Sequence, residues 1–208
     1  MIKEKDVFDV RKGWDDINAP NPVVWFDPQN ELTADLISQY LSNSFQEPNL
    51  AVTITQDDFQ YKTGFMKSET CPCLVIRSAE RGDGLSRFVL AVKKNYENSS
   101  TIAVCAWHGQ SESDRLNEQI KKSDNKYNKG LDKQKRKMDQ QDRYADFIGM
   151  VGTLVVGSIT NKLRNAKINK LVEQHKQARV GEHEYYIQII AAVNNALNVI
   201  SSNYEVCR

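Results

Sequence analysis

Two strand-like runs joined by a polar turn occupy residues 87–107, which read RFVLAVKKNYENSSTIAVCAW. Apolar and β-branched residues dominate both runs, and the segment from Asn95 to Ser100 between them is rich in turn-forming residues. This composition predicts a β-hairpin. A third run, Cys73 to Arg77, precedes it across the turn signal Gly82-Asp83-Gly84 and predicts a second hairpin in the same antiparallel meander.

A strand–helix–strand pattern lies upstream of this meander. Val23 to Phe26 is a short apolar run, and Leu50 to Thr55 alternates between apolar and polar residues. Between them, apolar residues recur on one face at helical spacing from Leu32 to Phe45, and Asp27-Pro28 supplies a candidate N-cap. The sequence therefore predicts an α+β fold in the order β-α-β-β-β-β, with one crossover at its start and one helix covering a mainly antiparallel sheet.

The character of the chain changes after Gly109. Residues 112–143 are almost entirely polar, and their apolar residues follow spacings of four, seven, four and seven: Leu116, Ile120, Tyr127, Leu131 and Met138. Such an 11-residue repeat favours a long helix whose stripe faces a partner, in the manner of a coiled coil. A solvated linker is the competing interpretation. We predict an α+β domain over residues 1–109 and a helical region over residues 110–208.

Small side chains recur every four residues within the uncharged segment 147–159, at Gly149, Thr153 and Gly157. Small residues allow two helix backbones to approach closely, so we expect a tight helix–helix contact here. A helix of this length spans about 20 Å, less than the ~30 Å hydrocarbon core of a bilayer, so a simple transmembrane span is disfavoured. Insertion of the segment into a membrane as an oligomeric, pore-forming element is the alternative.

Two amphipathic segments are expected to complete the helical region. The first follows Asn161 and stops near Gly181, because glycine is common just after the end of a helix. The second begins at about Glu184 and carries apolar residues at helical spacing from Tyr186 to Ile200. Helices of this kind suit self-association or docking into a larger complex.

A formal net charge of +1 conceals an uneven distribution of charge. Residues 1–118 sum to −6, residues 119–179 to +9 and residues 180–208 to −2. The basic segment includes a dense patch: Lys133, Lys135, Arg136 and Lys137. This patch suits nucleic-acid phosphates, but acidic neighbours dilute it and only Tyr127 offers a ring for base stacking. Nucleic acid is therefore the less favoured partner, and a solvated helix face is the simpler explanation of the patch. The uneven charge suggests either two functional parts or attraction between acidic and basic surfaces, within the molecule or across an oligomer.

Residues suited to catalysis or metal binding are sparse. A conceivable zinc set comprises Cys71, Cys73, Cys105 and His108. The gap between the first two cysteines is shorter than usual, and a strand places Cys105 and His108 on opposite faces, so we expect structural thiols, no metal and no other cofactor. No nucleophile elbow, phosphate-binding loop or zinc-protease motif is present, and the adjacent carboxylates of Asp57-Asp58 are typical of a solvated turn.

The opening residues 1–12 are charged and show no secretory signal, so we expect a cytoplasmic location. The leading hypothesis is a non-catalytic assembly or interaction protein that uses its helical region to bind a second copy or a protein partner. The first alternative is a membrane-associated or membrane-active protein that inserts residues 147–159. The second alternative is a small enzyme or a nucleic-acid-binding protein.

Overall fold

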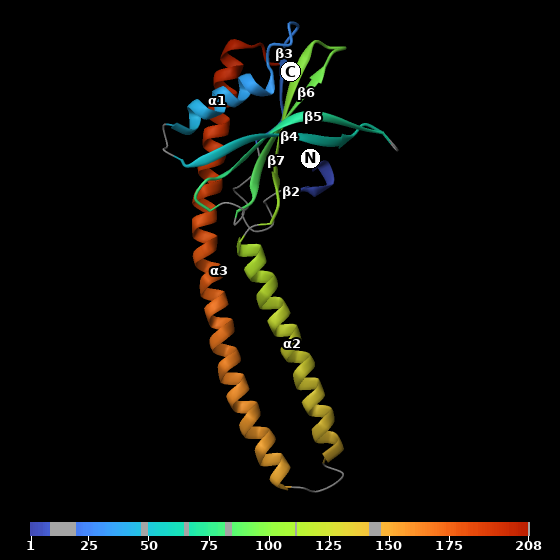
Figure 1. Ribbon diagram of the computed structural model, residues 1–208, viewed down its shortest axis with the longest axis vertical. Coiled ribbons are helices and arrows are strands. Elements are labelled where there is room, and N and C mark those ends of the chain that lie inside the picture. Colours follow the sequence, from blue (N-terminus) through green and yellow to red (C-terminus); the bar gives the residue numbers. More distant parts are fainter. Residues whose placement is uncertain are drawn as a thin grey trace. The chain divides into compact units, whose positions relative to one another are not determined.

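The computed structural model describes residues 1–8, 20–46, 50–64, 67–81, 85–110, 112–141 and 147–207, without the side chains of residues 8, 127, 130–141 and 147–164. Its elements follow the chain in this order (Figure 1): β1 (Ile2–Lys3), the 3-10 turn η1 (Glu4–Asp6), β2 (Val7–Phe8), β3 (Val23–Phe26), α1 (Ala34–Gln46), β4 (Val52–Lys62), β5 (Ser68–Ser78), β6 (Arg87–Asn95), β7 (Ser100–His108), α2 (Glu112–Gln141) and α3 (Phe147–Asn203). The predicted order β-α-β-β-β-β is confirmed from β3 to β7, and with it the α+β class.

Seven strands in the described part of the chain form one sheet in the order β1-β4-β5-β6-β7-β2, with β3 also paired to β7. Strands β4 to β7 form the predicted antiparallel meander. Strand β3 is antiparallel to β7, so β3 and β4 point in the same direction on opposite sides of the meander. The crossover through α1 therefore joins two strands that are not neighbours.

The N-terminal segment joins the two sides of the meander. Strand β1 pairs parallel to β4, with Ile2 opposite Phe59, and β2 pairs antiparallel to β7, with Val7 opposite His108. Only the 3 residues of η1 separate these two strands. The segment therefore crosses one face of the sheet and covers a small hydrophobic cluster there: Ile2, Phe59, Cys71, Cys73, Val75, Val89 and Ala91.

The opposite face of the sheet carries the main hydrophobic core. Side chains from the strands, from α1 and from the C-terminal part of α3 meet there, and they include Trp25, Ile37, Leu41, Leu74, Phe88, Trp107, Tyr186, Ile189 and Val193. Strand β3 is also tied to α3 by a hydrogen bond of 2.9 Å from Trp25 Nε1 to Ser201 Oγ. The covering helix that the sequence predicts is thus α1, with α3 packed beside it on the same face.

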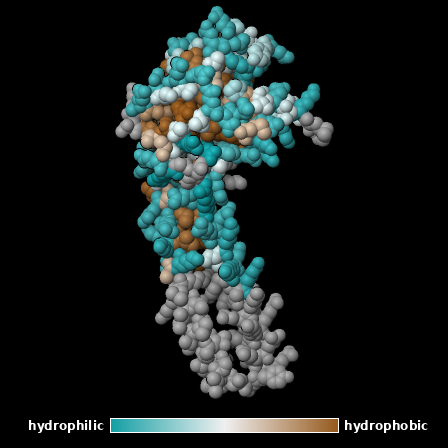
Figure 2. Space-filling model, viewed as in Figure 1, coloured by the Kyte–Doolittle hydropathy of each residue, from teal (hydrophilic) through white to brown (hydrophobic). Residues whose placement is uncertain are grey.

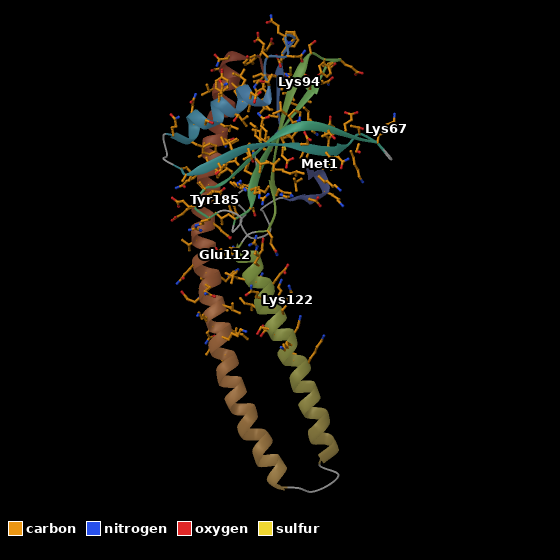
Figure 3. The ribbon with its side chains drawn as sticks, viewed as in Figure 1. Met1, Lys67, Lys94, Glu112, Lys122 and Tyr185 are labelled. Carbon is orange, nitrogen blue, oxygen red and sulfur yellow. The ribbon has the colours of Figure 1, made fainter. Side chains whose placement is uncertain are left out.

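Asp27 anchors the loop between β3 and α1. Its carboxylate accepts hydrogen bonds from the backbone N–H groups of Glu31 and Leu32, at 2.8 and 3.2 Å. Lys94 Nζ and the Thr101 hydroxyl also donate to it, at 2.7 and 2.6 Å (Lys94 is labelled in Figure 3). The expected N-cap role of Asp27 is therefore wrong: α1 begins later, at Ala34, after a loop that Asp27 holds in place.

Thr33 is the residue that caps α1. Its hydroxyl accepts the backbone N–H of Leu36 at 3.2 Å, and its carbonyl accepts the N–H of Ile37 at 3.0 Å, as in the first turn of a helix. The N-cap signal is present in the sequence, but it lies six residues after the aspartate that precedes Pro28.

Helix α3 runs without interruption from Phe147 to Asn203, so the helix end expected near Gly181 and the new start at Glu184 are wrong. A Cβ atom at Gly181 would lie 2.7 Å from Nη2 of Arg81. Gly181 lies within the helix and does not end it. Its missing side chain leaves room beside the helix for the Arg81 guanidinium group.

The chain divides into two compact units, one formed by Met1–Ser111 with Gly181–Arg208 and the other by Glu112–Val180. The first boundary between the units lies between Ser111 and Glu112. The last part of the expected region 110–208 belongs with the sheet instead, because its apolar residues from Tyr185 to Ile200 are buried in the main core.

Replacement of Asp27 by alanine should strongly destabilise the fold. Burial raises the pKa of Asp27, but hydrogen bonds from Lys94, Thr101 and two backbone N–H groups outweigh this effect and hold the pKa below its usual value. The variant leaves the Lys94 ammonium group in a largely buried site without its counter-ion, which typically costs about 3–5 kcal/mol. Urea unfolding at neutral pH would measure this loss.

Exposed Asp58 provides the matched control, and Asp58→Ala should change the free energy of unfolding by no more than about 0.5 kcal/mol. Because the pKa of Asp27 is lower in the folded state than in the unfolded state, its contribution is present above the unfolded-state pKa and is lost as the pH falls through the folded-state pKa. An Asp27→Ala variant as stable as the unmodified protein would contradict this account.

Candidate protein-interaction site

The predicted interaction residues fall into two groups. Leu116 and Ile120 lie on α2, and both side chains are half-buried. The remaining residues lie on helical backbone, but their side chains are outside the described part: Tyr127, Leu131, Met138, Gly149, Thr153, Gly157, and the basic patch Lys133, Lys135, Arg136 and Lys137. The long helix over residues 112–141 is confirmed, and the contacts of these residues stay predictions.

Each helix of the unit Glu112–Val180 has one half-buried face. On α2 this face includes Leu116, Ile120 and Ser123, and on α3 it includes Ile168, Leu171, Val172 and His175. Hydrophobic side chains gather along the seam between the two helices and hydrophilic ones surround them (Figure 2). Among the described side chains of the unit, only that of Ser113 is fully buried. The described part of this unit therefore has an apolar seam and no buried apolar core of its own.

The cysteines and His108 are not brought together as a metal site. Cys71 and Cys73 pack in the small cluster under the N-terminal segment, whereas Cys105 packs against the main core on the other face of the sheet. The register of β7 places His108 and Cys105 on opposite faces, as the sequence predicts. No group of three or more His, Cys, Asp or Glu side chains suited to a metal ion occurs in the described ranges.

A feature that sequence analysis missed is the open edge of β4. This strand is longer than expected, because Asp57 and Asp58 continue it and do not form the predicted turn. Strand β5 pairs with β4 along its whole length, but β1 covers the other side of β4 only at Phe59 and Gln60. The edge from Val52 to Asp58 has no neighbouring strand among the described residues.

The direction of each backbone group on β4 follows from two hydrogen bonds at its ends. Ala79 N–H donates to the Ala51 carbonyl at 2.9 Å, and Thr63 N–H donates to the Lys67 carbonyl at 3.1 Å. Both pairs lie in the β4–β5 register, so the odd-numbered residues of β4 direct their N–H and C=O groups toward β5. The even-numbered residues direct theirs toward the open edge.

Some of these outward groups are already bound within the chain. Lys62 N–H donates to the Glu4 carboxylate at 2.9 Å, Gln60 is paired with β1, and Asp58 N–H donates to the Asp57 carboxylate at 2.7 Å. In the described structure, the outward backbone groups of Val52, Ile54 and Gln56 have no hydrogen-bond partner. The open edge therefore consists of these three residues.

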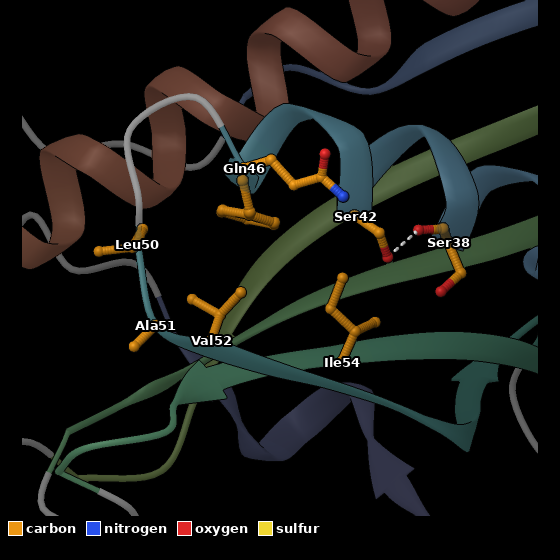
Figure 4. Close-up of a pocket in the computed structure, with 8 residues that line it drawn as sticks. Ser38, Ser42, Gln46, Leu50, Ala51, Val52 and Ile54 are labelled. Atoms are coloured by element: carbon orange, nitrogen blue, oxygen red, sulfur yellow. Dashed lines mark hydrogen bonds between the residues drawn. The ribbon is translucent and has the colours of Figure 1, made fainter.

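A groove of about 420 Å³ lies beside this edge, between β4 and α1 (Figure 4). Val52, Ile54, Phe45 and Leu50 supply its apolar lining. The α1 side of the groove is lined by the polar side chains of Ser38, Ser42 and Gln46, which lie at four-residue spacing on one face of the helix. Unpaired backbone groups beside an apolar groove are the features that bind an additional β-strand.

The sequence contains a signal for this edge. The segment Val52-Thr53-Ile54-Thr55-Gln56 carries no charged residue and no proline, the residue types that usually protect an edge strand from pairing. The signal is informative only once the sheet order is known, because the same composition suits a strand in the centre of a sheet.

Buried Cys71 and Cys73 and half-buried Cys105 should react slowly with thiol reagents in the native protein. Burial raises the pKa of the Cys71 thiol to about 11 and that of the Cys73 and Cys105 thiols to about 12, so very little thiolate is present at pH 8. Exposed Cys207 should therefore be the one thiol that reacts rapidly. A native-state titration with a chromogenic disulfide reagent would measure this, with Cys207→Ser as the control, and rapid reaction of more than one thiol would contradict it.

No known family model matches the chain, and neither does any curated protein or any solved structure. In the described ranges, no helix combines the length and the apolar character that a membrane span requires.

Proposed function

We propose that this chain is a non-catalytic assembly protein whose helical unit Glu112–Val180 associates with a second copy or docks onto a protein partner. The observation that supports the proposal is the half-buried apolar seam. Leu116 and Ile120 on α2, and Leu171 and Val172 on α3, each keep part of their apolar surface in water. A partner that covers this surface would complete the core of the unit.

The energetics favour association over an isolated helix pair. Full burial of a leucine, isoleucine or valine side chain stabilises a fold by about 1.5–3 kcal/mol, and partial exposure forfeits part of this gain. Most helical stability in proteins comes from the packing of an apolar face and not from local propensity. Two helical hairpins that pack their seams together form a four-helix arrangement, in which each seam is covered.

The dependence on salt distinguishes self-association of the helical unit from its docking onto an acidic partner. The described helices expose lysines on both sides of the seam: Lys121, Lys122, Lys126, Lys129, Lys167, Lys170 and Lys176. Two such units repel each other, so their association should strengthen as salt screens the repulsion. Docking onto an acidic surface, such as one on the acidic segment 1–118 of another copy, should instead weaken with salt.

Light scattering on the full chain, over a range of protein and salt concentrations, tests the proposal. We expect a mass above that of one chain. The double substitution of Leu116 and Ile120 by lysine should abolish association through the seam and lower the mass while the helical circular dichroism signal remains, because two charges then lie on the seam. Substitution of exposed Gln119 by alanine on the same helix is the control and should leave the mass unchanged.

A monomer at all concentrations and salt levels, together with a failure to bind any defined acidic protein surface, would contradict the proposal. Binding to vesicles that contain anionic lipids, without self-association, would favour the membrane alternative that concerns residues 147–159.

Glycine-to-alanine substitutions at Gly149 and Gly157 test the predicted close helix contact. Both residues lie on helical backbone. On an exposed helix, alanine stabilises by up to about 1 kcal/mol relative to glycine. If the small face packs against another helix, the added methyl groups should instead destabilise the protein, and leucine at either position should cost about 1–3 kcal/mol. Thermal unfolding of each variant measures the sign, and a stabilising alanine at both positions would refute the close contact.

A further inference from the structure

We propose that the open edge of β4 pairs with β4 of a second copy of the chain, antiparallel and centred on Ile54. The interface extends the sheet across two copies. It uses surfaces of the unit formed by Met1–Ser111 with Gly181–Arg208 and is independent of the helical unit Glu112–Val180. The edge is complementary to itself, which favours a second copy over an unrelated peptide.

The three open residues are symmetric about their centre. Antiparallel pairing about Ile54 places Ile54 opposite Ile54 of the second copy, and Val52 opposite its Gln56. All of these residues direct both backbone groups outward, so each such pair is a hydrogen-bonded pair that exchanges two bonds. The pairing uses every open N–H and C=O group on the described edge.

Other registers meet groups that are already bound. A shift of two residues in one direction places Val52 opposite Asp58, whose N–H is bound by the Asp57 carboxylate. The same shift in the other direction places Gln56 opposite Leu50, whose N–H donates to the Phe45 carbonyl. A shift of four residues places Val52 opposite Gln60, where β1 already lies. These bound groups therefore select the register centred on Ile54.

Side chains across the same register are compatible. Thr53 lies opposite Thr55 of the second copy in a pair that is not hydrogen-bonded through the backbone, and threonine pairs are favourable in such positions. The acidic residues do not face each other: Asp57 lies opposite Ala51, and Asp58 lies opposite Leu50. No like charges oppose each other along the paired segment.

The position of α1 also fits a second copy. This helix packs over both β4 and β5. With strands ~4.8 Å apart, pairing of two β4 strands brings the two α1 axes to roughly 10 Å from each other, which is close to the usual distance between packed helices. The facing side chains, Ser38 and Ser42, are small enough for this approach. The two grooves beside β4 would then meet and close against each other.

Disulfide trapping on the full chain tests the register. The variants Thr53→Cys and Thr55→Cys are prepared separately, each with Cys207→Ser to remove the exposed thiol. Paired residues that are not hydrogen-bonded have Cα atoms ~4.5 Å apart, within the range of a disulfide, whereas two copies of either residue lie about 8 Å apart, beyond that range. Mild oxidation of the mixture should give a covalent dimer, and either variant alone should give several-fold less.

Absence of the covalent dimer in the mixture, or equal yields in the mixed and unmixed samples, would overturn the proposal. The first result leaves the edge free for a strand from another protein, and the second indicates a different contact. The lysine substitutions at Leu116 and Ile120 should not change the cross-linking yield, so failure of the helical interface is distinguishable from failure of this one.

The pair Gln56→Pro and Gln56→Ala tests the backbone hydrogen bonds. Proline removes an outward N–H without taking a bond from β5, because Gln56 is an even-numbered residue, and proline is tolerated on an edge strand. Alanine keeps the N–H and removes only the hydrogen bond between Gln56 and Asp35. In the Leu116 and Ile120 lysine background, proline should raise the dimer dissociation constant at least tenfold relative to alanine. Equal constants in two variants that both fold would refute the pairing.

Discussion

The backbone groups at the two edges of the sheet impose the constraint on which the rest of this structure depends. On the β7 side, β2 and β3 both pair with β7. The outer side of β3 bonds in turn to residues 205–207, because Phe26 N–H donates to the Glu205 carbonyl and Cys207 N–H donates to the Val24 carbonyl. On the β4 side, β1, the Glu4 carboxylate and the Asp57 carboxylate satisfy the second half of the strand. Residues near both ends of the described chain are thus used to complete the sheet, and the short edge from Val52 to Gln56 is what is left open.

Much of the fold follows from local sequence patterns. The β-branched runs predict β3 to β7, and the helical spacing from Leu32 to Phe45 predicts α1, because these elements bury one face against a core. Elements with weak patterns were missed or misjudged. The strands β1 and β2 have only 2 residues each and show no periodicity. Asp57 and Asp58 resemble a turn, yet an edge strand tolerates charged side chains.

Tertiary context decides the features that the sequence pattern left ambiguous. Pro72 lies within β5, at a position whose backbone groups face away from β4 and toward β6. Because β6 pairs with β5 only from Cys73 onward, the missing N–H of Pro72 breaks no hydrogen bond of the sheet. Gly181 lies inside α3, where the Arg81 guanidinium group occupies the space that a side chain would take. The candidate site shows the same division: the periodicity of α2 predicted Leu116 and Ile120, but the open edge of β4 appears only when the strand order and the bound backbone groups are known.

We propose two surfaces for association, an apolar seam on the helical unit and an open strand edge on the sheet. The first of these proposals is that a partner covers the seam. The most direct measurement is amide hydrogen exchange of the full chain above and below the concentration at which it associates. The account predicts that the amides of α2 are protected in the associated protein and lose this protection on dilution. Rapid exchange throughout α2 in the associated protein would contradict it.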